Sequence, residues 1–424
     1  MLSRITIISE QYLLKHVILT KIMSKQDIEI NKIPTLNIII CGHIDHGKTT
    51  LLYKLSGKWT DTHSEELKRG ITIRLGYADI ILYKNAKGEY SRTQEGAPER
   101  YISFVDAPGH EMLMATMLSG AAIVDAAILV VAANEGIKPQ TQEHLVALEA
   151  KQIKHVIIVQ NKIDLVTKEQ AAKNYKDIKN LVKGTIAENA PIIPVSAQQD
   201  INIDKIYEAL CHIPLPERNL KDKPIFVVAR SFDINKPGTT PSNLHGTVLG
   251  GTLKQGTLKI GDTIEIKPGL TVKENNQVTY KPLITKISAL HKGKYSLEEL
   301  TPGGSASIET ELDMSLGKAD TLSGTTVSTQ GNLPENKSSV TLKHSLFKYI
   351  LGSQQQIPVA PIKTNEMLLL SINTAVSAGM VKKIKGSDIE LSLKIPIVAT
   401  KGENVGLARN INNHWRLIGY GEII

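Results

Sequence analysis

The sequence has 424 residues, enough for two to four domains that each bury a core. Its formal charge is +8 at pH 7 and hydrophobic residues make up 41% of it, which is typical of a globular chain and compatible with a nucleic-acid partner. Only Cys41 and Cys211 occur, which excludes a disulfide framework or a four-cysteine zinc site, and no apolar run is long enough to cross a bilayer.

Residues 1–33 are predicted to be an N-terminal extension that is flexible or docked on the surface. The apolar run at residues 5–8 is too short for a signal peptide, and no small-residue cleavage site follows it. Acidic residues such as Asp27 disfavour a transit peptide, although several lysines keep that option open. Translation could also begin at Met23.

A phosphate-binding loop is predicted at residues 42–49, where an apolar strand-like run (36–41) is followed by GHIDHGKT and then by a helical pattern. The two glycines allow a tight turn that brings backbone N–H groups around an anion at a helix N-terminus. Lys48 is expected to reach the β- and γ-phosphates, and the Thr49 hydroxyl to bind Mg²⁺. The predicted phosphate-binding residues are Asp45, His46, Gly47, Lys48, Thr49 and Thr50.

The charged stretch at residues 59–71 shows little apolar periodicity and is predicted to be a mobile loop that leads into a strand. In nucleotide switches, one hydroxyl from such a loop binds Mg²⁺ and the γ-phosphate until hydrolysis releases it. Thr72 is the candidate for that hydroxyl. The alternative is a solvated loop with no special role.

A second motif, DAPGH, begins at Asp106 where the apolar run 101–105 ends. The C-terminal edge of a sheet strand is where α/β proteins bind ligands, so the Asp106 carboxylate is predicted to hold the metal, through a water. His110 could orient the water that attacks the γ-phosphate, or it could cap the next helix.

Two further motifs indicate guanine. Asn161-Lys162-Ile163-Asp164 follows the apolar run 156–159, and one carboxylate, Asp164, can accept hydrogen bonds from both N1–H and the exocyclic amine of guanine. Adenine lacks this donor pair and would leave the carboxylate unpaired. Asn161 would brace the loop and the base, and the Lys162 stem would cover the ring. The segment Ser196, Ala197 and Gln198 would complete the site, with a backbone N–H directed to the guanine O6.

The alternation of elements predicts an α/β domain with a mostly parallel sheet covered by helices, over residues 34–218. Its predicted strands are 36–41, 101–105, 127–132, 156–159 and 192–195, and its predicted helices are 51–56, 112–118, 141–150, 169–188 and 203–211.

Beyond Pro216 the sequence changes to short strand patterns separated by Gly, Pro and Asn, which predicts two antiparallel β-barrels. The first, at residues 222–330, contains the strand patterns 224–230, 246–250, 263–267 and 283–287. The second, at residues 331–424, contains 340–344, 367–372, 389–395 and 405–408. The polar stretch 331–337 marks their boundary.

This order of motifs and domains resembles the translational GTPases. Several stretches narrow the resemblance to the gamma subunit of archaeal and eukaryotic translation initiation factor 2: residues 59–72, 112–121, 134–144, 187–197, 230–239 (RSFDINKPGT) and 415–421 (WRLIGYG). The match runs from about residue 34 to the C-terminus and is weakest between residues 321 and 356.

The resemblance implies a GTP-dependent carrier of methionyl initiator tRNA in the cytoplasm, with no membrane partner. It implies the core of a heterotrimer with alpha and beta subunits, acting on the small ribosomal subunit, with slow hydrolysis that awaits a GTPase-activating protein. GTP or GDP and Mg²⁺ would be bound, and Asp45 and the Gly70 carbonyl would help hold metal beside Thr49 and Thr72. The tRNA acceptor end would lie against the GTPase domain and the second domain, with salt-sensitive affinity.

The sequence departs from the family in one place. Family members often carry a cysteine-rich zinc knuckle before the DAPGH motif, but residues 83–100 contain no cysteine, so no zinc and a shorter, flexible hairpin are predicted. Three other functions share the motifs: an elongation factor of the Tu or selenocysteine-specific type, a GTPase that activates a sulfurylase, and a scaffold that binds GTP but scarcely hydrolyses it.

Overall fold

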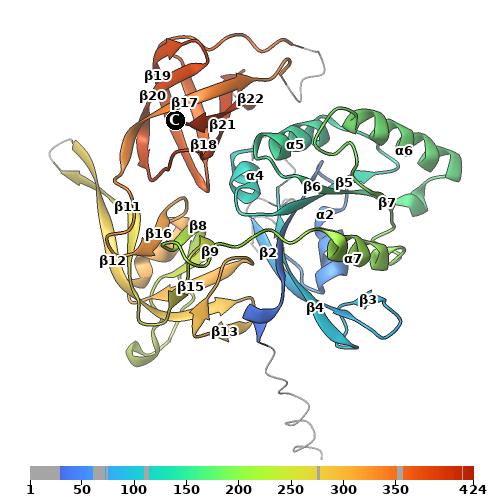
Figure 1. Ribbon diagram of the computed structural model, residues 1–424, viewed down its shortest axis with the longest axis horizontal. Helices are drawn as coiled ribbons and strands as arrows, with labels where there is room; N and C mark the ends of the chain where they lie inside the picture. Colours follow the sequence, from blue (N-terminus) through green and yellow to red (C-terminus); the bar gives the residue numbers. More distant parts are fainter. Residues whose placement is uncertain are drawn as a thin grey trace, which may run out of the picture. The chain divides into compact units, whose positions relative to one another are not determined.

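The computed structural model describes residues 29–60, 72, 75–108, 114–274, 277–350, 357–412 and 414–424 (Figure 1). The chain divides into two units, residues 1–33 and 34–424. In the first unit the described part holds one short 3-10 helix, η1 (Ile30–Lys32). The rest of the predicted N-terminal extension, including Met23, lies outside the described residues.

The first domain of the second unit is built on a seven-stranded sheet with the order β3-β2-β4-β1-β5-β6-β7. The strands are β1 (Thr35–Gly42), β2 (Gly76–Lys84), β3 (Tyr90–Ser91), β4 (Ala97–Asp106), β5 (Ala126–Ala132), β6 (His155–Asn161) and β7 (Ile192–Pro194). From β4 to β7 all neighbours pair in parallel, whereas β2 and β3 add an antiparallel edge. The carboxyl ends of β1, β4, β5 and β6 therefore meet along one edge of the sheet.

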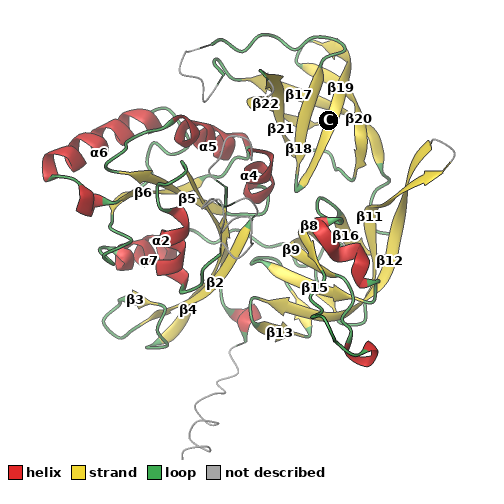
Figure 2. Ribbon diagram, turned by 180° about the vertical axis from the view of Figure 1, so that it is seen from behind, coloured by secondary structure: helices red, strands yellow, loops and turns green. Residues whose placement is uncertain are grey.

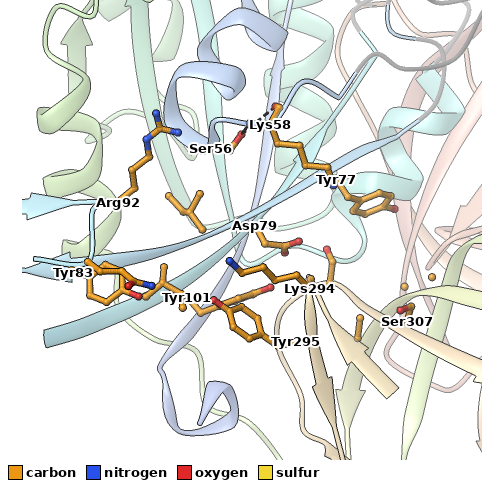
Figure 3. Close-up of a pocket in the computed structure, with 18 of the residues that line it drawn as sticks. Ser56, Lys58, Tyr77, Asp79, Tyr83, Arg92, Tyr101, Lys294, Tyr295 and Ser307 are labelled. Carbon is orange, nitrogen blue, oxygen red and sulfur yellow. Dashed lines mark hydrogen bonds between the residues drawn. The ribbon is translucent and has the colours of Figure 1, made fainter. Parts of the chain in front are cut away.

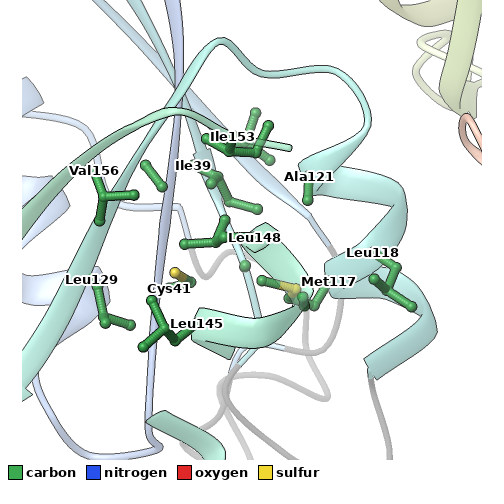
Figure 4. Packing of buried hydrophobic residues seen from close by; sticks show 14 of the residues in the cluster. Ile39, Cys41, Met117, Leu118, Ala121, Leu129, Leu145, Leu148, Ile153 and Val156 are labelled. Atoms are coloured by element: carbon green, nitrogen blue, oxygen red, sulfur yellow. The ribbon is translucent and has the colours of Figure 1, made fainter. Parts of the chain in front are cut away.

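Helices cover both faces of this sheet (Figures 1 and 2). They are α2 (Lys48–Ser56), α4 (Met114–Ala121), α5 (Pro139–Ala150), α6 (Lys168–Val182) and α7 (Ile203–His212). Successive residues of a strand point to opposite faces, so Ile39 packs with Leu145 of α5 in one core, and Ile40 packs with Leu51 of α2 in the other. Figure 4 shows the first of these cores around Ile39, with Leu145 among its side chains.

Helix α6 shows how local sequence sets the bounds of an element. Thr167 is its N-cap and forms a capping box with Gln170, in which each side chain bonds the backbone N–H of the other residue. The predicted helix 169–188 was too long, because Gly184 adopts φ +74° and the helix ends at Val182.

The second domain is a closed antiparallel barrel. Six strands run in the order β11-β16-β8-β9-β15-β12, and β12 pairs with β11 to close it, with β13 attached to β12. The strands are β8 (Ile225–Phe232), β9 (Val248–Gln255), β11 (Thr263–Glu274), β12 (Gln277–Lys292), β13 (Tyr295–Leu297), β15 (Ala306–Thr310) and β16 (Thr326–Thr329), and a short pair is formed by β10 (Leu258–Lys259) and β14 (Glu299–Leu300).

The third domain is a second closed barrel, with the order β17-β20-β19-β18-β21-β22. Its strands are β17 (Lys337–Leu346), β18 (Met367–Ile372), β19 (Ala375–Lys385), β20 (Asp388–Ile397), β21 (Asn404–Ile411) and β22 (His414–Ile423). The predicted fold class, a mostly parallel α/β domain followed by two antiparallel barrels, is confirmed. Within the described ranges, none of the helices has the length and apolar character that a membrane crossing requires.

Candidate nucleotide-binding site

The predicted phosphate loop connects β1 to α2, and two of its glycines are required by close packing. Gly42 (φ +140°) lies so near β5 that a Cβ would be 2.3 Å from the Val130 carbonyl oxygen. A Cβ on Gly47 (φ +85°) would be 2.5 Å from Asn161 Nδ2. Asp45 is exposed on the loop and also adopts a positive φ, +61°. The loop thus has a compact shape that side chains at the two glycines would destroy.

Lys48 lies across this loop rather than in solvent. Its Nζ donates to the His43 carbonyl oxygen at 2.8 Å, and the residue is 6% exposed. Helix α2 begins at Lys48, and Thr49 and Thr50 belong to its first turn. The positive end of the helix dipole therefore lies at the loop. The arrangement offers a cation and a helix N-terminus to an anion at the same place.

Three hydroxyl groups and one carboxylate meet beside the start of α2. Thr49 Oγ1 lies 3.0 Å from Asp106 Oδ2 and 3.3 Å from Thr72 Oγ1, and Asp106, at the end of β4, is fully buried. Thr60 Oγ1 also donates to Asp106 Oδ2, at 2.9 Å. Oxygen donors are what Mg²⁺ prefers, so these residues fit that ion.

Of the other predicted metal and catalytic residues, only Asp45 lies in the described part of the chain. Asp45 is exposed on the loop, and the hydrogen bonds of the Thr49 hydroxyl go to Thr72 and Asp106. Gly70 and His110 lie outside the described residues.

Asn161 at the end of β6 connects three loops. Its Nδ2 donates to the His46 carbonyl oxygen at 3.0 Å, and its Oδ1 accepts from the Ala197 N–H at 3.1 Å. The phosphate loop is thereby bonded to both predicted guanine loops. The segment that starts at Ser196 was predicted to direct a backbone N–H to the guanine O6; in this structure its Ala197 N–H bonds Asn161.

The other predicted guanine residues surround Asn161. Asp164 lies exposed on the short helix η3 (Ile163–Leu165), and the preceding Lys162 adopts φ +60° and donates to Glu135 Oε1 at 3.3 Å. Ser196 is fully buried and its Oγ accepts from the Gln199 N–H at 3.2 Å, whereas Gln198 is exposed. These positions leave the Asp164 carboxylate accessible to a base.

Two residues of this site escaped the sequence motifs. His144, on α5, accepts a hydrogen bond at Nδ1 from the Gly42 N–H at 2.8 Å, and burial lowers its pKa to about 3, so the ring stays neutral and can accept. Glu135, after β5, pairs with Lys162. Both belong to the stretch 134–144, which carried the family resemblance but gave no local signal of these contacts.

The side chain of His46 lies on the inner side of the loop. It is fully buried, and its Nδ1 is 3.3 Å from the Val130 carbonyl oxygen. Burial lowers the pKa of His46 to about 4, so its ring is neutral near pH 7.

Comparison with known proteins agrees with this geometry. Residues 33–215 match the family model of the elongation factor Tu GTP binding domain, and residues 338–423 match that of the initiation factor eIF2 gamma C terminal domain. Translation initiation factor 2 subunit gamma of Thermoplasma acidophilum is 50% identical over 398 residues, covering 92% of this chain and 97% of that protein. The same subunit of Methanocaldococcus jannaschii is 49% identical, with the same coverage.

The chain belongs to the family of translation initiation factor 2 gamma subunits. It is a GTP-binding GTPase of translation initiation, and the predicted resemblance and the predicted enzyme class are both confirmed. Members of this family bind guanine nucleotides, typically with Mg²⁺. The roles of individual residues toward the nucleotide stay predictions.

Solved structures share the fold. A bacterial selenocysteine-specific elongation factor superposes with a TM-score of 0.72 at 23% identity, covering 92% of this chain and 58% of that one. Translation elongation factor SelB from Methanococcus maripaludis, in complex with a GTP analogue, gives a TM-score of 0.69 at 22% identity, covering 92% and 79%. At this identity the likeness concerns the three-domain architecture alone.

Proposed function

We propose that this chain carries methionyl initiator tRNA in a GTP-dependent manner. It would form the core of a heterotrimeric factor with alpha and beta subunits and act on the small ribosomal subunit in the cytoplasm. The observation that carries the proposal is the identity of about 50% over 92% of the chain to translation initiation factor 2 gamma subunits. A cavity in the structure supports it.

The cavity has a volume of about 880 Å³ and is lined by the GTPase sheet and the first barrel. Tyr77 and Asp79 of β2 and Tyr101 of β4 line it from the sheet, and Phe232 and Tyr295 line it from the barrel. Figure 3 shows the Tyr101 and Tyr295 rings close to one another and to Asp79. Its volume lies in the range of small-molecule sites, large enough for a terminal nucleotide with an aminoacyl group.

The chemistry of the lining also suits the end of a charged tRNA. Aromatic faces stack unpaired bases, and lysine and arginine side chains attract phosphates. Lys58, Arg92 and Lys294 are among the lining residues and supply that charge. Affinity is therefore expected to fall as the salt concentration rises.

One segment connects the cavity to the nucleotide site. Thr72, whose hydroxyl lies beside Thr49, shortly precedes β2, and β2 carries Tyr77 and Asp79. A loop that the γ-phosphate holds in place would thus fix the segment that leads into the strand at one wall of the cavity. This shared segment supports the GTP dependence of tRNA binding.

At the nucleotide site, Lys48 and the N–H groups of the phosphate loop would hold the β- and γ-phosphates, and Asp164 would read the guanine. Thr49, Thr72 and Asp106 would hold Mg²⁺, with Asp45 and Gly70 as further candidates. When bound, the ion neutralises charge that builds up on the phosphates. His110 remains the predicted group for the attacking water.

The decisive experiment measures binding of charged tRNA to the full chain. We expect methionyl initiator tRNA to bind tightly with a GTP analogue and much more weakly with GDP, and methionyl elongator tRNA to bind weakly in both cases. Equal or stronger binding of elongator tRNA would overturn the proposal in favour of an elongation-type factor.

A pair of variants tests whether the cavity holds the acceptor end. Phe232→Ala removes one aromatic wall, and Phe347→Ala removes a ring that packs on Tyr420 in the third domain. Because stacking contributes about 1–3 kcal/mol per base, Phe232→Ala should weaken tRNA binding roughly 5- to 150-fold. Phe347→Ala should leave it near the wild-type value. Equal effects of the two substitutions would place the acceptor end elsewhere.

A further inference from the structure

Three side chains that can bind metal converge on the inner side of the phosphate loop. His43 and His46 belong to the loop, and Glu135 follows β5. One ligand atom from each lies within 4.8 Å of the others, and this is the one His, Cys, Asp or Glu group of such closeness among the described residues. The two imidazole rings have centroids 5.0 Å apart.

The ring of His46 has the orientation that is typical of a metal-binding histidine. A backbone carbonyl can only accept, so the contact of Nδ1 with the Val130 oxygen at 3.3 Å assigns the ring hydrogen to Nδ1 and leaves a lone pair on Nε2. Nε2 is buried, has no hydrogen-bond partner among the described residues, and lies 3.9 Å from Glu135 Oε2. Metal-bound histidines are held in this way, with the second ring nitrogen donating to a carbonyl or carboxylate.

The two oxygens of Glu135 have different surroundings. Oε1 accepts from Lys162 Nζ at 3.3 Å, whereas Oε2 faces His46 and lies 4.0 Å from Lys138 Nζ. Lys138 is partly exposed and can turn toward solvent. Oε2 can therefore bind a metal ion while Oε1 keeps its ion pair with Lys162.

We propose that His43, His46 and Glu135 bind one divalent transition-metal ion of the zinc class. Two imidazole nitrogens and one carboxylate oxygen with an open fourth position are a donor set that Zn²⁺ accepts, whereas Mg²⁺ favours oxygen donors alone. Tetrahedral ligand atoms at bond lengths of about 2.0–2.1 Å lie roughly 3.4 Å apart, so the side chains close inward on binding. This site is separate from the oxygen group of Thr49 and Asp106.

The site would revise the expectation of a zinc-free chain. That expectation followed from the absence of cysteines at residues 83–100, and the present donor set contains no cysteine. A metal here would connect the phosphate loop to Lys162 through Glu135. It would rigidify the loop from its inner side.

Titration with Co²⁺, a spectroscopic substitute for Zn²⁺, tests the proposal on the full chain. The titration is carried out without nucleotide and in excess Mg²⁺, which keeps Co²⁺ from the oxygen site. Nitrogen-ligated tetrahedral Co²⁺ absorbs visible light far more strongly than octahedral oxygen-ligated Co²⁺. We expect a strong band that saturates at one equivalent and disappears when Zn²⁺ is added. No such band in the wild-type chain would overturn the proposal.

Two ligand variants and one control locate the metal. His43→Ala and Glu135→Gln should weaken Co²⁺ binding by more than the roughly 10–100-fold that is typical of changes outside the ligand set. His344→Ala removes an imidazole that bonds the Ser387 carbonyl oxygen in the third domain, and should leave binding unchanged. Thermal unfolding confirms that each variant is folded. Wild-type binding in both ligand variants, or its loss in His344→Ala, would assign the metal to another place.

Discussion

Replacing Asn161 with alanine should weaken nucleotide binding, although the hydrogen bonds of its side chain to described residues go to other loops. The amide donates to the His46 carbonyl oxygen at 3.0 Å and accepts from the Ala197 N–H at 3.1 Å. Asn161 and Ala197 are each 2% exposed and His46 is fully buried. The substitution therefore leaves the His46 carbonyl oxygen and the Ala197 N–H buried without these hydrogen bonds.

The size of the effect follows from these two bonds. A buried polar group that loses its partner costs about 1–3 kcal/mol, so the two together amount to about 2–6 kcal/mol. The bonds hold the phosphate loop next to the predicted guanine loop. Without the amide, part of the binding energy of the nucleotide would be spent on ordering these two loops. Even the lower value, at 1.4 kcal/mol for each factor of ten, corresponds to a dissociation constant raised roughly 30-fold.

Fluorescent GDP and GTP analogues measure these dissociation constants directly. Asn219→Ala is the matched control, because Asn219 is exposed and its amide bonds Asp222 in the linker after the GTPase domain. We expect the control to bind nucleotide as the wild type does. A folded Asn161→Ala chain with wild-type affinity would refute the idea that this amide organises the site.

Three further predictions follow from single positions. Asp164→Asn should lower the preference for GTP over xanthosine triphosphate in a competition assay, because the amide donates where guanine also donates; an unchanged preference would remove Asp164 from base recognition. Gly47→Ala should reduce both the unfolding midpoint and GTP affinity, because its Cβ would lie 2.5 Å from Asn161 Nδ2. Gly88→Ala is the control, because Gly88 has a similar φ of +82° but open space around it, so its substitution causes only backbone strain of about 1–2 kcal/mol. Equal effects at the two glycines would argue against the clash. Burial lowers the pKa of Lys151 from 10.5 to about 7, so between these pH values the unfolded chain binds more protons and stability rises with pH. Urea unfolding at pH 7 and pH 9 should show a smaller rise for Lys151→Met, and an equal rise would contradict that pKa.

The elements of the GTPase domain were predictable because their patterns are local. The apolar runs at residues 36–41 and 127–132 lie inside β1 and β5, where both faces of the strand are covered and nearly every residue is apolar. The barrels were predicted less completely. Strand β16 has the sequence TVST and β19 contains glycine, alanine and several lysines, so neither shows a clear alternation. They are strands because barrel closure supplies their partners, β8 and β20 among them.

The site residues show the same contrast between local sequence patterns and contacts that depend on the fold. Phosphate loops and guanine loops use backbone groups and short side chains at fixed spacing, so Lys48, Thr49 and Asp164 could be proposed from a motif. His144 could not, because its bond to Gly42 joins residues that are 102 positions apart. Such a contact depends on α5 packing beside the end of β1, and no local pattern encodes that position.

The joint between the GTPase sheet and the first barrel depends on a polar residue within an otherwise apolar strand. Asn37 lies in the apolar strand β1 and is 3% exposed. Its Oδ1 accepts from the Gly304 N–H at 2.6 Å, and its Nδ2 donates to the Ile123 carbonyl oxygen at 2.8 Å and to Thr252 Oγ1 at 3.2 Å. A buried amide satisfied on both sides is stabilising, whereas an unsatisfied one would be costly.

This bonding fixes β1, the strand that leads into the phosphate loop, to the barrel that carries Phe232. Arg218 strengthens the joint by donating from both terminal nitrogens to Asp125, which in turn accepts from the Asn37 N–H. A strand held in this way cannot shift with the nucleotide without breaking several buried bonds. Under the proposed function, we therefore expect the γ-phosphate to act through Thr72 and β2, which pairs with β4 and whose Tyr77 lines the cavity.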